Sequence, residues 1–259
     1  MIVTLTTDFG LTDHYAGTMK GVILGLCPKA QIIDISHGIT PYDIGEAAYT
    51  IAQAWRYFPP KTVHVVVVDP GVGSARRPLL VEAAGHRFVG PDNGVFSMIY
   101  SASPCKVRHL TNPRFFLQQV SRTFHGRDLF APVAAHLAAG APPARMGKLV
   151  QDYVQGDFVH PLPAGKGKWN ARILKIDLFG NVTTNLRAAD FPDLADHKFR
   201  LSAGPVKITT LAQSYATAAP GAPLLILGSS GYYEISINQG DAAKALKLQP
   251  GARLALKIA

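Results

Sequence analysis

The run Val-Val-Asp-Pro-Gly-Val-Gly at residues 67–73 places an acidic side chain, Asp69, between an apolar stretch and a glycine turn. A carboxylate in this position could remove a proton from water, or hold water against an electrophile. Gly71 and Gly73 tolerate backbone angles that other residues resist, and they let main-chain amides approach a ligand. The spacing matches neither the phosphate loop G-x-x-x-x-G-K-S/T nor the dinucleotide fingerprint G-x-G-x-x-G. The run therefore predicts a catalytic or ligand-binding carboxylate outside those two motifs.

Two arginines and two further aspartates are candidates to act with Asp69. Arg76 or Arg77 could fold back to pair with Asp69 and hold its carboxylate ionised, although an alternative is a surface arginine pair after a turn. Asp8 ends another apolar run and is followed by a glycine, so it is either a second site carboxylate or a helix cap. Asp13 could be the N-cap of the first helix.

Four more polar segments could contribute to a site. Residues 91–94, Pro-Asp-Asn-Gly, form a strong turn signal whose amides could also contact a ligand. His125 lies between a phenylalanine and a glycine at the predicted start of a helix, although a lone histidine is more often structural. Residues 177–185 and 228–238 combine Asn, Ser, Tyr and Glu, which suits either hydrogen bonding to a polar small molecule or hairpin turns.

The segments that must position these residues alternate between strand and helix through the first half of the chain. Hydrophobic periodicity and Pro punctuation predict strands at residues 2–7, 31–36 and 63–68, helices at 13–26, 42–57, 95–102 and 127–139, and a hairpin at 79–84 and 86–89. Five of the six residues from 63 to 68 are Val, as in a strand covered on both faces. This order predicts an α/β domain with a mostly parallel sheet, in which ligands bind beyond the carboxyl ends of the strands.

The second half changes in character. Residues 160–168 are rich in Pro, Gly and Lys and are typical of a linker. Short β-like segments follow at residues 171–177, 182–186, 198–202, 206–211, 224–227, 233–238 and 253–258. We therefore expect an α/β domain at residues 1–164 and a smaller all-β, barrel-like domain at residues 165–259.

Composition limits the classes of protein to consider. Hydrophobic residues make up 47 % of the 259 residues and charged residues 17 %, so a sizeable core is expected. No apolar run is long enough to cross a bilayer, no signal peptide is recognisable, and two isolated cysteines predict no disulfide framework, so a cytoplasmic protein without membrane contact is expected. The net charge is +9, but the basic residues are scattered along the chain and form no basic helix, so no nucleic-acid partner is expected.

Seven stretches together resemble the S-adenosylmethionine hydroxide adenosyltransferase family, whose relatives include the fluorinases and chlorinases. The stretches occur in family order and cover nearly the whole chain; they are residues 7–13, 40–43, 68–73, 91–94, 124–128, 179–185 and 228–234. The resemblance implies an N-terminal α/β domain, a C-terminal β domain, and a homotrimer that binds its substrate between subunits. It implies hydrolysis of S-adenosylmethionine to adenosine and L-methionine, without a cofactor or a bound metal.

The resemblance also implies roles for individual residues. Asp69, Arg76 and His125 would handle the water. Substrate contacts would come from Asp8 at the ribose hydroxyls, Asn181 at the adenine edge, Tyr42, Phe124 and Tyr215 around the nucleoside, and Asp13, Ser229, Glu234 and the backbone near Ile237 around the methionine part.

Three other functions remain as alternatives. A halogenase is disfavoured because a carboxylate repels a halide, and the halogenases carry an uncharged residue in place of Asp69 and lack the histidine at position 125. A non-catalytic protein that binds S-adenosylmethionine or a nucleoside is the second alternative. A metal-dependent hydrolase built on Asp8, Asp13, Asp69 and His125 is the third.

Overall fold

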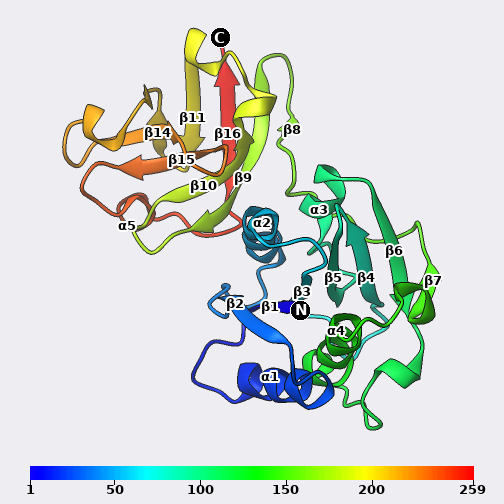
Figure 1. The fold of residues 1–259 in the computed structure, drawn as a ribbon. Coiled ribbons are helices and arrows are strands. Elements are labelled where there is room, and N and C mark those ends of the chain that lie inside the picture. Colours follow the sequence, from blue (N-terminus) through cyan, green and yellow to red (C-terminus); the bar gives the residue numbers. More distant parts are fainter. The chain divides into compact units, whose positions relative to one another are not determined.

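The computed structural model describes residues 1–259, which form two compact units, Met1–Gly156 and Asp157–Ala259 (Figure 1). The boundary lies a few residues before the one that the sequence predicts. Residues 157–164 belong to the second unit because they bond to its strands. The Asn185 side-chain amide donates to the Phe158 carbonyl at 3.2 Å, and Arg172 pairs with Asp157 at 2.9 Å.

The first unit is built on a seven-stranded sheet in the order β2-β1-β3-β5-β4-β6-β7. Its strands are β1 (Ile2–Thr7), β2 (Gln31–Ser36), β3 (Val63–Val67), β4 (Pro78–Ala83), β5 (His86–Pro91), β6 (Cys105–Leu110) and β7 (Gly147–Leu149). β2, β1, β3 and β5 are parallel neighbours, whereas β4, β6 and β7 add antiparallel pairs. The sheet is thus mostly parallel in strand direction. The predicted hairpin of β4 and β5 is built into this sheet, because β5 also pairs with β3.

Helices cover both faces of this sheet. They are α1 (Tyr15–Leu26), α2 (Ile44–Ala54), α3 (Ser97–Ala102) and α4 (Ala131–Ala138), with 3-10 turns at Trp55–Tyr57, Pro113–Phe115 and Pro143–Arg145 and a π-helical turn at Gly126–Phe130. The valines of β3 alternate between two cores: Val65 packs with α1 and α4, and Val66 packs with α2 and α3. This two-sided burial explains the nearly unbroken run of valine.

The prediction that Asp13 caps the first helix is wrong. His14 occupies the N-cap position without a side-chain hydrogen bond, and Asp13 is exposed in the preceding loop. In the next helix, α2, the N-cap is Asp43, whose carboxylate accepts a hydrogen bond from the amide of Glu46 at 2.9 Å.

The second unit is a curled sheet in the order β12-β11-β16-β9-β10-β15-β14-β13, with β8 beside β9 (Figure 1). Its strands are β8 (Leu162–Pro163), β9 (Lys168–Ile176), β10 (Val182–Arg187), β11 (Phe199–Ala203), β12 (Val206–Ile208), β13 (Leu211–Ala212), β14 (Pro223–Leu227), β15 (Tyr232–Ile237) and β16 (Arg253–Ile258). Neighbouring strands are antiparallel except β13 and β14. Leu201, Ile235 and Leu256 are fully or almost fully buried in one apolar core of this unit.

The sequence predicts a purely β second unit, and this prediction is wrong in one respect. The unit contains a short helix, α5 (Ala242–Leu246), and 3-10 turns at Ala188–Asp190, Leu194–Asp196 and Tyr215–Thr217. Asp241 caps α5 by accepting from the amide of Lys244 at 2.8 Å, and Lys247 ends it in the left-handed conformation. Five residues give too short a periodic pattern to stand out in the sequence. No helix in either unit combines the length and the apolar character that a membrane span requires.

Candidate active site

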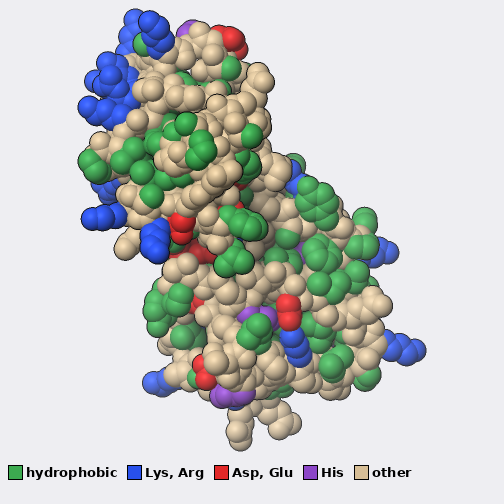
Figure 2. Space-filling model, turned by 90° about the vertical axis from the view of Figure 1, so that its left-hand side faces the viewer, with side chains coloured by type: hydrophobic (Ala, Val, Ile, Leu, Met, Phe, Trp, Pro, Cys, Tyr) green, Lys and Arg blue, Asp and Glu red, His purple; other side chains and the backbone are tan.

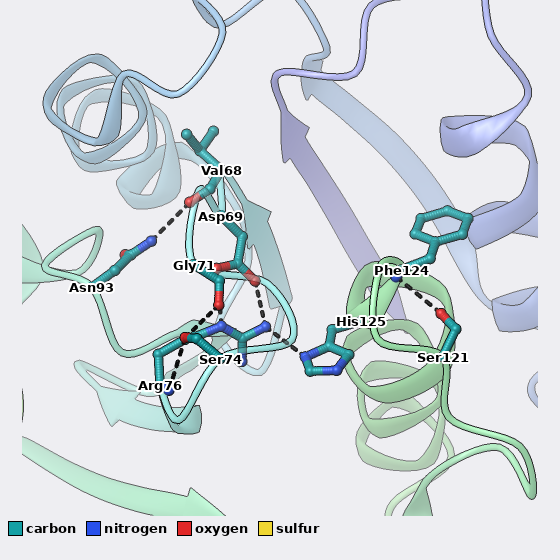
Figure 3. A network of polar contacts seen from close by, with 9 residues as sticks. All are labelled: Val68, Asp69, Gly71, Ser74, Arg76, Asn93, Ser121, Phe124 and His125. Atoms are coloured by element: carbon teal, nitrogen blue, oxygen red, sulfur yellow. Dashed lines mark hydrogen bonds and ion pairs between the residues drawn. The ribbon is translucent and has the colours of Figure 1, made fainter.

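Asp69 lies just beyond β3, at the carboxyl ends of the parallel strands. Arg76 binds its carboxylate through two nitrogens: Nε donates to Oδ1 at 2.9 Å, and Nη2 donates to Oδ2 (Figure 3). Both side chains are buried, with 5 % of Asp69 and 9 % of Arg76 exposed. A bidentate pair of this kind fixes the plane of the carboxylate and matches each negative oxygen with an N–H donor.

His125 joins this pair from a distant part of the chain. Its Nδ1 lies 2.7 Å from Nη2 of Arg76 (Figure 3). A guanidinium can only donate, so Nδ1 accepts, and the neutral ring carries its proton on Nε2. Burial lowers the pKa of His125, and the positive charge of Arg76 lowers it further, against the opposing effect of Asp69. These three residues, the Asp69 cluster, therefore hold a neutral histidine beside a paired carboxylate.

Phe130 contacts the cluster through Arg76. It ends the π-helical turn that follows His125, and it is completely buried. The guanidinium carbon of Arg76 lies 5.3 Å from the centre of its ring, a distance at which the ring face attracts a cation. Arg76 is thus held by three partners of different chemistry. No motif in the sequence indicated Phe130, because its contact arises only from packing.

Gly73 lets the Asp69 loop pack against the segment that carries His125. Its φ is +77°, and a Cβ at this position would lie 2.2 Å from the carbonyl oxygen of Arg122. Within the same loop, the Ser74 hydroxyl donates to the carbonyl of Gly71 at 2.6 Å and accepts from the amide of Arg76 at 3.2 Å. The glycine turn therefore serves loop packing and the placement of Arg76.

Arg77, the alternative partner for Asp69, is bound elsewhere. Its Nε donates to Asp92 at 2.8 Å, and its Nη1 donates to Asp152 at 2.8 Å. Asn93 donates from its side chain to the carbonyl of Val68 at 2.9 Å, which braces the residue before Asp69. The Pro-Asp-Asn-Gly turn thus acts structurally here, and Arg76 is the partner of Asp69.

A cavity of about 360 Å³ opens beside the Asp69 cluster. We call it the first cavity; it is lined by Asp8, Phe9, Tyr15, Pro41, Tyr42, Val67, Asp69, Val72, Thr123, Phe124, His125 and Gly126. Five residues predicted for the site meet here: Asp8, Tyr42, Asp69, Phe124 and His125. Asp13 is not among the lining residues.

Asp8 and three aromatic rings shape the first cavity. The carboxylate of Asp8 accepts a hydrogen bond from the Tyr42 amide at 2.9 Å. Burial raises the pKa of Asp8, and the nearby charge of Asp69 raises it further, while that amide bond lowers it. Phe124 meets Phe9 and Tyr15 edge to face, with ring centres 5.9 and 5.1 Å apart. Phe9 and Tyr15 were not among the residues predicted for the site, although both lie within or beside the family stretch at residues 7–13.

A second cavity, of about 540 Å³, lies within the second unit. It is lined by Asp177, Phe179, Asn181, Tyr215, Ile237, Gln239 and Gly240, which include three of the residues predicted for the site. Asp177 orients Asn181 by accepting from its side-chain amide at 3.0 Å and from its backbone amide at 2.8 Å. The second N–H and the carbonyl oxygen of the Asn181 side-chain amide could then recognise the polar edge of a ligand.

Glu234 and Ser229 lie outside the lining of the second cavity. Burial raises the pKa of Glu234, and the charge of Asp177 raises it further, while hydrogen bonds from Thr183 and Tyr215 lower it. Gly228 packs over this carboxyl so closely that a Cβ would lie 2.3 Å from its Oε1. Ser229 is exposed in the turn between β14 and β15.

The structure brings no three His, Cys, Asp or Glu side chains into an arrangement that could hold a metal ion. Asp8, Asp69 and His125 share the first cavity, but Arg76 contacts both Asp69 and the Nδ1 of His125, and its positive charge would repel a metal ion at these donors. The donor set therefore does not suit the metal-dependent alternative.

An α/β unit with a buried carboxylate, arginine and histidine beside a cavity, joined to a β unit with a polar cavity, defines a two-domain enzyme for a small molecule. Residues 3–147 match the SAM hydroxide adenosyltransferase N-terminal domain, and residues 171–255 match the corresponding C-terminal domain. The chain belongs to the SAM hydroxide adenosyltransferase family.

Relatives are similar over almost their whole length. A protein of Salinispora arenicola named (R)-S-adenosyl-L-methionine hydrolase is 38 % identical, over 97 % of this chain and 96 % of that protein. A protein of Thermus thermophilus with the same name is 37 % identical over 96 % of both chains, whereas a fluorinase of an Actinoplanes strain is only 27 % identical, over 96 % of this chain and 95 % of its own. The crystal structure of an uncharacterized conserved protein from Thermotoga maritima superposes with a TM-score of 0.87 at 35 % identity, covering 99 % of this chain and all of that one.

Proposed function

We propose that this protein hydrolyses S-adenosyl-L-methionine by attack of water at the 5′ carbon, which gives adenosine and L-methionine. The observation that carries the proposal is the Asp69 cluster at the wall of the first cavity. The names of the relatives support it. Those names also specify the R form; because a sulfonium with three different substituents is chiral, we propose that the R epimer is the preferred substrate.

The leaving group explains why one acceptor of protons is enough. Attack forms a bond from the water oxygen to the 5′ carbon and breaks the bond from that carbon to sulfur. The electron pair stays on sulfur, so methionine leaves as a neutral thioether and needs no general acid. The water oxygen becomes a protonated alcohol, a strong acid, which a carboxylate deprotonates readily. The protein must chiefly hold the water in line with the carbon–sulfur bond.

Asp69 is the acceptor in this proposal. The Nδ1 of His125 already accepts from Arg76, and its Nε2 carries the proton, so His125 can donate to the water oxygen but cannot take its proton. Each oxygen of Asp69 holds one bond from Arg76 and keeps a further lone pair. Arg76 is then the common support that orients the other two. The negative charge of Asp69 also favours the sulfonium and disfavours a halide.

The remaining residues are assigned to substrate binding. In the first cavity, Asp8 would accept hydrogen bonds from the ribose hydroxyls, and Tyr42 and Phe124 would line the nucleoside. In the second cavity, Asn181 would recognise the adenine edge, Tyr215 would line the nucleoside, and the backbone near Ile237 would contact the methionine part. We propose contacts to the methionine part from Asp13, Ser229 and Glu234, all of which lie outside the linings of both cavities.

We also propose a homotrimer in which the substrate is held at subunit interfaces. Exposed apolar side chains support an interface, since Leu178 is 98 % exposed and Phe179, which lines the second cavity, is 77 % exposed. The reaction as written uses no cofactor. A cytoplasmic location fits its two free cysteines, Cys27 and Cys105.

The decisive experiment incubates the purified protein with each epimer of S-adenosylmethionine and quantifies adenosine and methionine. We expect equimolar products, and a loss of roughly 100- to 10,000-fold in kcat for Asp69→Asn. Asp193→Asn, which removes an exposed carboxylate of the second unit, is the matched control and should turn over normally.

Three results would contradict the proposal. Tight binding of substrate without products would favour the non-catalytic alternative. A 5′-halo-adenosine formed in the presence of chloride or fluoride would favour a halogenase. Turnover by Asp69→Asn at the wild-type rate would show that Asp69 is not the proton acceptor.

A further inference from the structure

The register of three neighbouring strands places basic side chains directly opposite one another on the outer face of the second unit. Arg200 of β11 is opposite Lys257 of β16, and Lys257 is opposite Lys168 of β9. Two residues along the same strands, Ser202, Ala255 and Asn170 form a neutral row. Because same-face residues alternate along a strand, these rows lie on one side of the sheet, opposite the buried leucines.

Two further pairings extend this surface. Lys207 of β12 is opposite Ser202, and Arg253 of β16 is opposite Arg172 of β9. We name the whole set the basic face; its charged members are Lys168, Arg172, Arg200, Lys207, Arg253 and Lys257. Figure 2 shows Lys and Arg side chains projecting from one edge of the C-terminal unit, with few acidic side chains among them.

The basic face is almost without counter-charge. Only Arg172 forms an ion pair, with the exposed Asp157, and the other five cations form none. Like charges directly opposite in an antiparallel pair are destabilising. The register contains three such pairs, Arg200 with Lys257, Lys257 with Lys168, and Arg253 with Arg172. An anionic partner would relieve this repulsion.

A hollow of about 390 Å³ lies at one end of the first row. Its lining includes Lys198, Arg200, Lys257 and the hydroxyl-bearing Thr209. Phe199 and Ala259 complete the lining. Three cations and a hydroxyl around one hollow suit a phosphate group.

We propose that the basic face binds the phosphate backbone of a single-stranded nucleic acid, without regard to sequence. Neighbouring strands are about 4.8 Å apart and same-face residues along a strand are about 6.7 Å apart, which gives a grid of cations on the scale of successive phosphates. Asn170 and Ser202 add neutral hydrogen-bonding groups within the grid. The charged rows contain no large apolar side chain that could enter a lipid layer, which argues against a membrane. They also contain no aromatic side chain that could stack on bases, so binding would rest on contacts to phosphates, which carry no sequence information.

The basic face is independent of the proposed hydrolysis, since none of its residues lines either of the two cavities assigned to substrate. The proposal differs from the prediction, made from the sequence, that the protein has no nucleic-acid partner. The cations are scattered along the chain, and only strand pairing brings them together.

The test measures fluorescence anisotropy of a labelled oligothymidylate of about twenty nucleotides, titrated with the full-length protein at several salt concentrations. The double variant Arg200→Glu/Lys257→Glu should bind at least about 10-fold more weakly, and its slope of log affinity against log salt should shrink by about 1.4, since each lost contact to a single strand contributes about 0.7. The matched control Lys29→Glu/Lys148→Glu changes the net charge equally with two exposed lysines of the first unit, and it should bind as wild type does.

Several outcomes would overturn the proposal. The proposal fails if the control variant loses as much affinity for the oligonucleotide as the double variant does, or if the double variant binds as tightly as wild type. It also fails if wild type does not bind the oligonucleotide at about 0.15 M salt. Binding to phosphatidylserine vesicles with no binding to the oligonucleotide would assign the face to a membrane instead. Normal release of adenosine by the double variant shows that it is folded; if that release is lost, Lys168→Gln/Arg253→Gln replaces it under the same criteria.

Discussion

Arg76 donates to His125 and to Asp69 from the same nitrogen, Nη2, so the histidine and the carboxylate share one donor group. This arrangement determines the state of both partners. His125 must be neutral to accept at Nδ1, and Asp69 must be ionised to accept at both oxygens. The cluster is therefore poised with one proton acceptor and one proton donor facing the same cavity, and Arg76 is where a substitution should have the widest effect.

Arg76 and Arg77 offer a matched pair of substitutions at adjacent positions. Arg76→Lys should lower kcat at least about 10-fold, because an ammonium cannot make the bidentate contact and also reach His125. Arg77→Lys should leave kcat almost unchanged and lower the free energy of unfolding by about 1 kcal/mol, since its partners are Asp92 and Asp152. Adenosine release and thermal unfolding of both variants measure this; a larger loss of kcat in Arg77→Lys would reverse our assignment.

The pKa of His125 should move in opposite directions in two variants. Asp69→Asn removes a negative charge that favours the imidazolium, so the pKa should fall. Arg76→Gln removes a positive charge that opposes it, so the pKa should rise. Titration of the histidine ring protons by NMR gives both values, with the exposed His197 as an internal reference. Shifts of the same sign in both variants would mean that His125 does not sit between these charges.

Acid should destabilise the first unit through His64. Burial, together with the neighbouring His86, lowers the pKa of His64 to about 3. Since the ordinary value is about 6.5, the unfolded chain binds the proton first as pH falls. The contribution of neutral His64 to the free energy of unfolding is therefore fully present above about pH 6.5, and it is lost as the pH falls toward 3. Urea unfolding across this range should show a shallower pH dependence for His64→Gln than for wild type or the exposed-site control His197→Gln. Equal slopes in all three proteins would contradict the role of His64.

Alanine substitutions at Gly73 and Gly140 distinguish the cost of a steric clash from the cost of backbone strain. Both have positive φ, but a Cβ at Gly73 would meet the Arg122 carbonyl, whereas Gly140 faces open space. Gly140→Ala should lower the free energy of unfolding by about 1 kcal/mol from strain alone. Gly73→Ala should cost about 3 kcal/mol and should also reduce kcat, because the clash displaces the loop that carries Asp69. If the two variants lose equal stability and retain full turnover, the loop does not depend on this close approach.

Local patterns in the sequence predicted most of the elements. β1, β2 and β16 have the bounds expected, since alternating or continuous apolar residues between turn signals define a strand without knowledge of its neighbours. β6 and β7, which carry mixed polar residues at the edge of the first sheet, were not predicted, nor was the helix α5. The candidate carboxylate Asp69 was also visible, because a strand end followed by Pro and Gly is a local feature.

The amino-acid sequence by itself determined the family motifs, the strand ends that carry Asp8 and Asp69, and a set of cations spread over the chain. Only the tertiary structure decided which arginine meets Asp69, which nitrogen of His125 is occupied, and that Arg200, Lys257 and Lys168 stand in one row. The physical reason is that local patterning depends on residues within a few positions of one another. The choice of partner depends on strand register and loop packing between segments as far apart as residues 76 and 125, and these are set by burial of the whole core.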